Sequence, residues 1–382
     1  MPPTEIDQAS AAVSALSLKD QVLQKQPLTR NYSLDALYKN VKIQPHIGSE
    51  FEKGSLIIRD KFYPRIQIRD ILKAENADEL IFDFAVLVSE RNVVFLRDQD
   101  VTFEEQKNFV DRLGRAAGKP ATSKLHTHPL TERFSELGDE ALIITSKFAG
   151  EYANYSDRGE LHSNGWHTDI TFEPVPSDYA ALIIREAPVE GGDTLWASSY
   201  EIYERLSPAF RTFLEGLTAT HFAENFIKLE QLGFAKINEG PRGAPEDLGK
   251  GLTAVHPVIR TNPVTGWKGI FVNKGFTKRI NELSKDESDI VLEHLFNLTT
   301  QNHDLQVRFR WNKNDVAVWD NRSALHTATT DFNTDEFIRF GQRATSLGER
   351  PYFDPKSTSR REALGIAPPV SRRAHLATLA KA

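Results

Sequence analysis

The stretch Gly165–Phe172 reads Gly-Trp-His-Thr-Asp-Ile-Thr-Phe and holds two side chains, His167 and Asp169, that could bind a metal ion. The run favours a β-strand, in which residues two apart point to the same face. The imidazole and the carboxylate would then lie side by side. One more His would complete a 2-His-1-carboxylate triad, which binds one face of an octahedral iron and leaves positions open. Because the chain has 11 His and 53 acidic residues, the pair by itself is a weak signal.

The best third ligand is His326. It follows Trp319-Asp320-Asn321-Arg322, where a strand ends in a turn that leads into the next strand. A buried His bonded to a carbonyl is the alternative for this residue considered alone. Together with His167 and Asp169 it predicts an iron centre.

Residues 338–343 add two cations to this pattern. Arg339, Gly341 and Arg343 share one face of the predicted strand. Guanidinium groups on an inward face are costly unless anions accompany them, and each can bind an oxyanion through two hydrogen bonds. The alternative is an exposed edge strand with solvated charges. Two anion sites beside an iron triad favour 2-oxoglutarate plus an anionic substrate.

Composition narrows the class of protein. With 382 residues, 40% of them hydrophobic and 26% charged, the chain is typical of a globular protein of one large or two ordinary domains. A net charge of −6 argues against general nucleic-acid binding. The absence of Cys excludes disulfides and thiolate metal sites. No apolar run approaches 20 residues and no signal peptide is evident, so we expect no membrane span and a cytoplasmic location.

The elements that must position these residues are mostly short strands. We predict an α+β, mainly β fold, with strands at 56–58, 66–68, 93–96, 141–145, 167–172, 179–185, 194–197, 269–273, 306–311, 316–319 and 338–345. Apolar residues at helical spacing predict a helix over 75–90. Capping boxes at Thr102, Ser198 and Ser284 predict helices from 102, over 199–215 and over 285–300.

The ends of the chain differ in composition from its middle. Residues 1–40 are expected to form a mobile N-terminal arm, with a short helix at 11–24, before a domain over 41–355. Residues 356–382 form a basic C-terminal tail. Within the domain, 223–251 is rich in Gly, Pro and charge, which makes it a candidate lid.

Several stretches, taken together and in order, resemble the taurine and 2,4-dichlorophenoxyacetate dioxygenase family. They cover about residues 60–355 and comprise Trp166–Phe172, Gly191–Ser198, His256–Pro263, Gly269–Phe276 and Trp319–Arg343. The resemblance implies a double-stranded β-helix, or jelly roll, with flanking helices. It also implies an enzyme that uses Fe(II), 2-oxoglutarate and O2, and it is nearest to the sulfonate-oxidising branch.

The same resemblance assigns roles to single residues. It implies that the iron ligands are His167, Asp169 and His326, that 2-oxoglutarate is held by Thr194 and Arg339, and that substrate is bound by Arg343, His128 and Phe271. The implied reaction converts a small aliphatic sulfonate to an aldehyde and sulfite, with succinate and CO2 as co-products. One alternative is the same enzyme class hydroxylating, desaturating or cyclising a carboxylate, sulfate ester or amino acid in a biosynthetic pathway. Another is a non-catalytic cupin-like binding protein.

The chain departs from the taurine enzymes at two places. Thr131 stands three positions after His128, where those enzymes carry Tyr, and Ser163-Asn164-Gly165 replaces or shifts an Asn that helps hold taurine. Both differences put taurine itself in question. Family members are often dimers or tetramers, so the resemblance also implies a homo-oligomer.

Overall fold

The fold is described from a computed structural model of the chain. It describes residues 26–52, 56–58, 61–130, 138–146 and 161–367. The predicted helix at 11–24 and Thr131 lie outside these residues.

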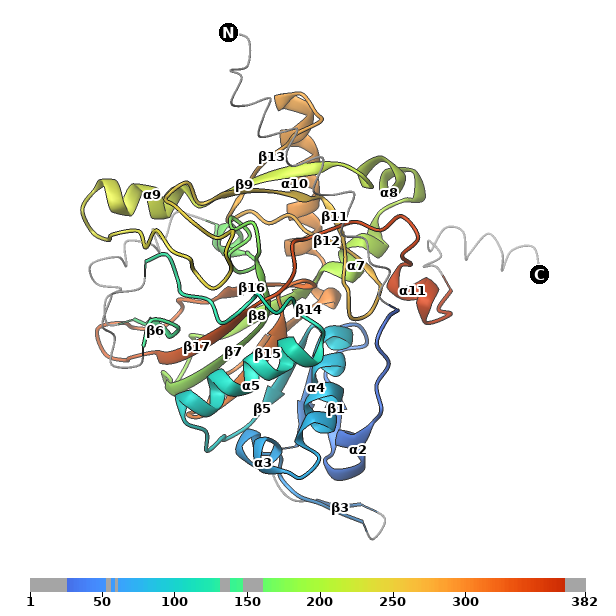
Figure 1. The fold of residues 1–382 in the computed structure, drawn as a ribbon, viewed down its shortest axis with the longest axis vertical. Coiled ribbons are helices and arrows are strands. Elements are labelled where there is room, and N and C mark those ends of the chain that lie inside the picture. Colours follow the sequence, from blue (N-terminus) through green and yellow to red (C-terminus); the bar gives the residue numbers. More distant parts are fainter. Residues whose placement is uncertain (1–25, 53–55, 59–60, 131–137, 147–160, 368–382) are drawn as a thin grey trace, which may run out of the picture.

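Two facing sheets form the body of the molecule (Figure 1). The larger has seven strands in the order β1-β2-β5-β15-β7-β17-β6, in which β2–β5 is the parallel pair. Its strands are β1 (Asn40–Lys42), β2 (Ser49–Phe51), β5 (Val93–Leu96), β6 (Leu142–Thr145), β7 (Ser177–Glu186), β15 (Val316–Asp320) and β17 (Phe340–Leu347). The smaller has the order β14-β8-β16, with β8 (Thr194–Ser198), β14 (Gln306–Phe309) and β16 (Ala324–Ala328).

The alternation of side chains along the central strands explains why both faces of the large sheet are apolar. In β5, Val93 and Phe95 face the small sheet, whereas Val94 and Leu96 face the opposite side. β15 and β7 alternate in the same way. The inner side packs against Trp196 of β8 and forms the core between the sheets. Since both faces are covered, these strands read as continuous hydrophobic runs.

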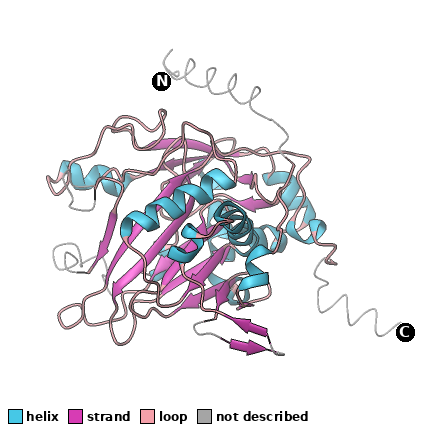
Figure 2. Ribbon diagram, turned by 60° about the horizontal axis from the view of Figure 1, so that its bottom comes forward, coloured by secondary structure: helices cyan, strands magenta, loops and turns pink. Residues whose placement is uncertain are grey.

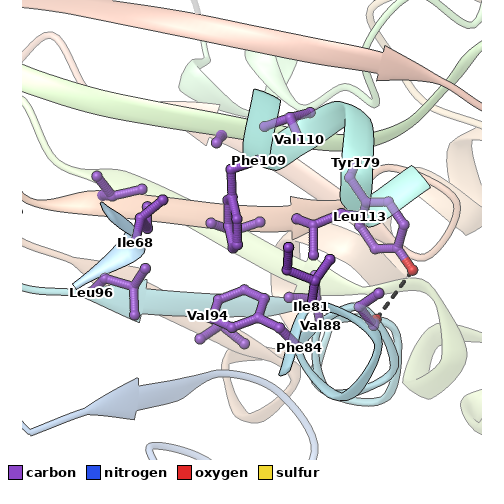
Figure 3. Packing of buried hydrophobic residues seen from close by; sticks show 14 of the residues in the cluster. Ile68, Ile81, Phe84, Val88, Val94, Leu96, Phe109, Val110, Leu113 and Tyr179 are labelled. Atoms are coloured by element: carbon purple, nitrogen blue, oxygen red, sulfur yellow. Dashed lines mark hydrogen bonds between the residues drawn. The ribbon is translucent and has the colours of Figure 1, made fainter. Parts of the chain in front are cut away.

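Helices cover the outer face of the large sheet. α4 (Ala77–Arg91) and α5 (Phe103–Ala116) pack there, with α3 (Ile68–Lys73) beside them. Figure 3 shows Phe84 of α4 and Phe109 of α5 meeting over the sheet, and their rings pack edge-on at 5.2 Å. The predicted capping box at Thr102 is present, and the helix predicted at 75–90 is confirmed as α4.

The remaining elements lie outside the two facing sheets (Figure 2). A further sheet has the order β10-β9-β13, and β11–β12 and β3–β4 are hairpins. The strands are β3 (Leu56–Ile58), β4 (Lys61–Tyr63), β9 (Thr218–Phe222), β10 (Thr253–Pro257), β11 (Ile259–Thr261), β12 (Lys268–Ile270) and β13 (Thr277–Ile280). The helical elements are α2 (Ser33–Leu37), η2 (His162–Gly165), α7 (Ser199–Arg205), α8 (Pro208–Leu214), α9 (Glu224–Gln231), α10 (Lys285–Gln301), η3 (His303–Leu305) and α11 (Arg360–Ala363).

Several predicted elements differ from the observed ones. The helix predicted over 199–215 is two helices, because Ser207 caps a new helix and Pro208 occupies its first turn. The strand predicted at 66–68 is wrong, since Ile68 opens α3 and its N–H donates to the Gln99 side chain. The strand predicted over 269–273 is shorter, ending at Ile270.

The first and last stretches that the structure describes form ion pairs with helices of the body. Arg30 forms a buried ion pair with Asp83 of α4, at 2.8 Å between Nη2 and Oδ2. At the other end, Arg360 and Arg361 of α11 pair with the buried Glu201 of α7, at 3.0 and 3.1 Å. Residues 26–40 and 356–367 are therefore part of the folded body.

The candidate lid at 223–251 contains a helix, α9, which lies at the upper left of Figure 1. The segment is anchored by Arg242, whose Nε and Nη2 donate to the two carboxylate oxygens of Glu173 at 2.5 and 2.8 Å. Both side chains are almost completely buried. Among the described residues, no helix combines the length and apolar character that a membrane crossing requires.

Candidate functional site

The predicted strand at 167–172 is wrong, although its two side chains still meet. His167 forms one β-bridge with His326 of β16, in which each backbone N–H donates to the other residue's carbonyl at 3.0 and 2.8 Å. The chain then turns away, and Ile170 has φ of 52°. The bridge and the turn, rather than strand alternation, bring His167 beside Asp169.

The three predicted iron ligands converge. Each offers one ligand atom, and the three atoms lie within 4.8 Å of one another. Nε2 of His167 and Nε2 of His326 are each 3.8 Å from Oδ1 of Asp169. The second carboxylate oxygen of Asp169 is buried and receives no hydrogen bond from the described residues. Two imidazoles and one carboxylate at this spacing fit the donor set that non-haem Fe(II) takes.

Neighbouring groups fix the orientation of these ligands. Nδ1 of His167 donates to the Gly165 carbonyl at 2.8 Å, which leaves Nε2 free to bind metal. The N–H of Asp169 donates to the Asn321 side chain at 3.2 Å. Asn321 also accepts from the Trp319 indole and donates to Ser177. Asn321 was not singled out from the sequence, although it stands in the Trp319–Arg322 motif beside the third ligand.

The surroundings hold the ligands in metal-binding protonation states. Burial lowers the pKa of His326 to about 3 and also lowers the pKa of His167. Burial alone would raise the pKa of Asp169, but Arg343, the two His ligands and the Asn321 hydrogen bond together outweigh burial and lower that pKa to about 2. At neutral pH the site therefore presents two neutral imidazoles and a carboxylate, the forms that coordinate a cation.

Arg343 reaches the triad directly. Its Nη1 donates to Oδ1 of Asp169 at 2.7 Å, and its Nε is buried without a partner among the described residues. The Arg predicted to bind substrate thus contacts a metal ligand and still has an N–H donor free for an anion.

Arg339 lies in a different environment. Its Nε donates to the Gly192 carbonyl at 2.8 Å and its Nη2 to Oγ1 of Thr194 at 3.2 Å. Among the described residues no carboxylate forms an ion pair with it, and burial lowers its pKa to about 10. A buried guanidinium without an anion is costly, which makes this a fitting place for an anionic ligand. Thr194 also accepts from the Trp311 indole at 3.0 Å, so its hydroxyl proton can point to that ligand.

Gly341 lies between the two Arg positions but does not leave room for a ligand. A Cβ there would lie 2.6 Å from the Ile183 carbonyl and 2.7 Å from the Ile184 side chain. The register of β17 against β7 shifts beside it. The glycine therefore permits close packing of β7 on β17. The alternative of an exposed edge strand is wrong, because β17 lies between β7 and β6.

His128 lies next to this group. Its Nδ1 accepts the Leu130 N–H at 3.2 Å, so its Nε2 carries the proton of the neutral ring. Burial, then the charge of Arg343, lowers its pKa to about 3. His126 is buried, and its ring packs edge-on against His128 at 6.1 Å.

The ring of Phe271 packs against side chains other than those of the triad. Its ring packs against His221 and His256, with the Arg260 guanidinium 4.6 Å from the ring centre. None of its described ring contacts is with the triad, Arg343 or His128. Two aromatic rings of the described residues do contact the triad: Phe276 lies 6.1 Å from the His167 ring, and Trp319 lies 5.0 Å from the His326 ring.

Gly275 is the sequence feature from which the position of Phe276 could have been predicted. A Cβ at Gly275 would lie 3.1 Å from the Cβ of His167. A glycine beside an aromatic residue within a matched family stretch therefore marks the place where this loop meets the metal ligand.

Comparison with known proteins agrees with this geometry. The family model described as "Taurine catabolism dioxygenase TauD, TfdA family" matches residues 58–345. An alpha-ketoglutarate-dependent dioxygenase of Neocamarosporium betae is 43% identical, over 89% of this chain and 98% of its own length. An alpha-ketoglutarate-dependent sulfonate dioxygenase of Saccharomyces cerevisiae is 33% identical, over 82% of this chain and 68% of its own.

A solved structure is similar as well. A taurine dioxygenase from Burkholderia xenovorans superimposes with a TM-score of 0.60 and 25% identity, over 84% of this chain and 94% of its own. The family match extends over more than half of the chain and includes the triad. The chain therefore belongs to the TauD/TfdA family and is an alpha-ketoglutarate-dependent dioxygenase that uses Fe(II), 2-oxoglutarate and O2.

Proposed function

We propose that this dioxygenase hydroxylates a small organic anion, and that the anion is an aliphatic sulfonate. The observation that carries the proposal is the pair of differently placed guanidinium groups beside the triad. Arg339 is buried with no carboxylate partner among the described residues, whereas Arg343 contacts Asp169 and keeps an unpaired donor. One anion site suits the co-substrate and the other suits the substrate.

Arg339 and Thr194 would bind the distal carboxylate of 2-oxoglutarate. The guanidinium is already oriented by the Gly192 carbonyl, and the Thr194 hydroxyl by the Trp311 indole. Because these two donors are already oriented, binding the carboxylate of 2-oxoglutarate costs little side-chain conformational entropy.

Arg343 and His128 would bind the head group of the substrate. Arg343 supplies a positive charge, and His128 supplies a neutral Nε2–H. A tetrahedral oxyanion such as a sulfonate can accept from both. The Saccharomyces cerevisiae relative is named for a sulfonate, which supports this choice, whereas the Neocamarosporium betae relative is named for no substrate.

His167, Asp169 and His326 would hold Fe(II), which with O2 and 2-oxoglutarate supplies the oxidation of a substrate C–H bond to C–OH. The protein's part is to orient that bond and exclude water. If the hydroxyl forms on the carbon next to sulfur, it loses its proton as a C=O bond forms and the C–S bond breaks. The products are then an aldehyde, sulfite, succinate and CO2.

The test is production of succinate and sulfite by the purified protein with Fe(II), ascorbate, 2-oxoglutarate and a panel of sulfonates. Equal amounts of both products with one sulfonate are expected. Succinate stimulated only by a carboxylate, a sulfate ester or an amino acid would keep the enzyme class and reject the sulfonate.

We further infer that the two facing sheets form the jelly roll of the family, and that residues 223–251 cover the substrate. The sheets' shared core supports the first inference. The second is supported by α9, which brings Phe226 to the His128 ring. A cytoplasmic location and a homo-oligomer, dimer or tetramer, stay predictions.

A further inference from the structure

Two phenylalanine rings lie between His128 and the metal ligand His167. Phe226 of α9 packs edge-on against the His128 ring, with centroids 5.2 Å apart. Phe276, just before β13, packs edge-on against the His167 ring at 6.1 Å. The two phenyl rings are themselves 6.2 Å apart. An unbroken row of rings therefore leads from the proposed anion contact to the metal.

This row has an apolar backing. Phe172 is fully buried and contacts Phe226 at 5.4 Å and Phe276 at 5.0 Å. Leu130 and Ile227 pack against the same cluster. His128, Phe226, Phe276 and His167 are each only partly buried, so part of every ring remains available for contact. Such rings bind an apolar group with little loss of side-chain entropy.

The surroundings of the row offer no carboxylate for an ammonium group. Asp169 is the one carboxylate of the described residues whose charge shifts the pKa of the His128 or His167 ring. Its Oδ1 is paired with Arg343. Glu173, four residues after Asp169, is buried and paired with Arg242. Glu224, two residues before Phe226, is paired with Lys228 and Lys278. An ammonium group beside the phenyl rings would lose water without gaining an anionic partner from the described residues.

We infer, resting on the proposed function, that the substrate is an organic anion whose carbon chain is apolar, and that Phe226 and Phe276 determine this specificity. The head group lies at Arg343 and His128, and the chain lies along the two phenyl rings. Phe226 comes from the segment 223–251, so that segment selects the substrate.

Taurine and propane-1-sulfonate test the inference sharply, because they have nearly the same shape and differ in an ammonium against a methyl group. We expect kcat/KM for sulfite release by the Fe(II)- and 2-oxoglutarate-loaded enzyme to be at least about tenfold higher with propane-1-sulfonate. Pentane-1-sulfonate should be better still. A preference for taurine would overturn the inference and leave the proposed function standing.

Substitution of Phe226 tests its role. Phe226→Ala should lower kcat/KM for pentane-1-sulfonate about tenfold, change that for taurine less than about twofold, and leave the KM for 2-oxoglutarate unchanged. Phe226→Leu should restore most of the loss. Phe213→Ala, at an exposed position of α8, is the matched control. Equal losses for both substrates in Phe226→Ala would reject a role in specificity.

Direct binding measurements distinguish a failure of the specificity inference from a failure of the proposed reaction. Pentane-1-sulfonate and taurine are titrated calorimetrically, without O2, into enzyme loaded with Fe(II) and 2-oxoglutarate. Tighter binding of pentane-1-sulfonate, weakened by Phe226→Ala, supports the inference even if sulfite is not released, an outcome that would reject only the proposed reaction. Absence of binding by either anion would reject both.

Discussion

At the scale of single residues, the two guanidinium groups of the site differ in whether their removal would leave a buried charge unpaired. Arg339 contacts a carbonyl and a hydroxyl, so its removal leaves no buried charge unpaired among the described residues. Arg343 contacts Asp169, so its removal uncovers a buried carboxylate. The two substitutions should therefore have different consequences.

Arg339→Ala should raise the KM for 2-oxoglutarate strongly and the KM for substrate little. The loss corresponds to about 2–5 kcal/mol, because the distal carboxylate would be bound without its charge partner. Arg343→Ala should do the reverse. Initial rates at varied concentrations of each ligand measure both effects, and weakening of the same ligand by both variants would contradict the assignment.

Asp169→Ala should abolish iron binding and turnover, because the remaining imidazoles supply no charge to balance the cation. Bound iron is measured by metal analysis after reconstitution. Asp289→Ala, on the exposed side of α10, serves as the control. An unchanged iron content in Asp169→Ala would remove this carboxylate from the site.

At the scale of elements, one buried ion pair attaches the segment 223–251 to the loop that carries Asp169. Arg242 binds Glu173 through two nitrogens and also donates to the carbonyls of Asn238 and Gly249. Asp247 holds the same loop by accepting the Val175 N–H at 2.9 Å. The position of Phe226 beside the His128 ring therefore depends on this attachment.

Glu173→Gln should destabilise the protein by about 3–5 kcal/mol, because Arg242 would remain buried without its anion. Glu173→Gln combined with Arg242→Met should recover part of that loss. Chemical denaturation measures the free energy of unfolding of Glu173→Gln, of Arg242→Met and of the double variant. A double variant as unstable as the sum of both single losses would show that the two side chains act independently.

The raised pKa of Asp247 should make the stability of the protein depend on pH. Burial, then the charge of Glu173, raises its pKa from 3.8 to about 8 in the folded protein. Between these values the folded protein holds a proton that the unfolded chain has released, so this group's contribution to stability falls as pH rises, by up to about 1.4 kcal/mol per pH unit. Asp247→Asn should lack this fall. Its Tm relative to the parent should increase from pH 5 to pH 8, and a constant difference would contradict the assignment.

At the scale of the whole molecule, the site joins the ends of both sheets to the loops beyond them. His326 comes from the small sheet, Arg343 from the large sheet, and His167 from the loop bridged to β16. Ligands that bind all of these parts in the folded state should stabilise the whole domain.

Mn(II), a substitute for Fe(II) that is less prone to oxidation, should raise the Tm, and 2-oxoglutarate should raise it further. At 100 times the Kd, each ligand adds about 2.7 kcal/mol, which is a shift of several degrees. Asp169→Ala should lose both increments and Arg339→Ala only the second. A Tm of Asp169→Ala that still responds to Mn(II) would place the metal elsewhere.

The sequence by itself determined the types of side chain and most of the strands that carry them. Continuous apolar runs located β5, β7 and β15, because both faces of these strands are covered by apolar layers. Period-two alternation placed Arg339 and Arg343 on one face of the next predicted strand. Family motifs then named the triad, which the structure brings together.

Only the tertiary structure decided the contacts between segments distant in sequence. His167 meets His326 through a single bridge across 159 residues of chain, not within a strand, and no local periodicity encodes such a bridge. Phe276 packs against the His167 ring because Gly275, the residue before it, lets this loop approach the metal ligand. The pairing of Arg343 with Asp169 likewise exists only once β17 and the metal loop have packed together.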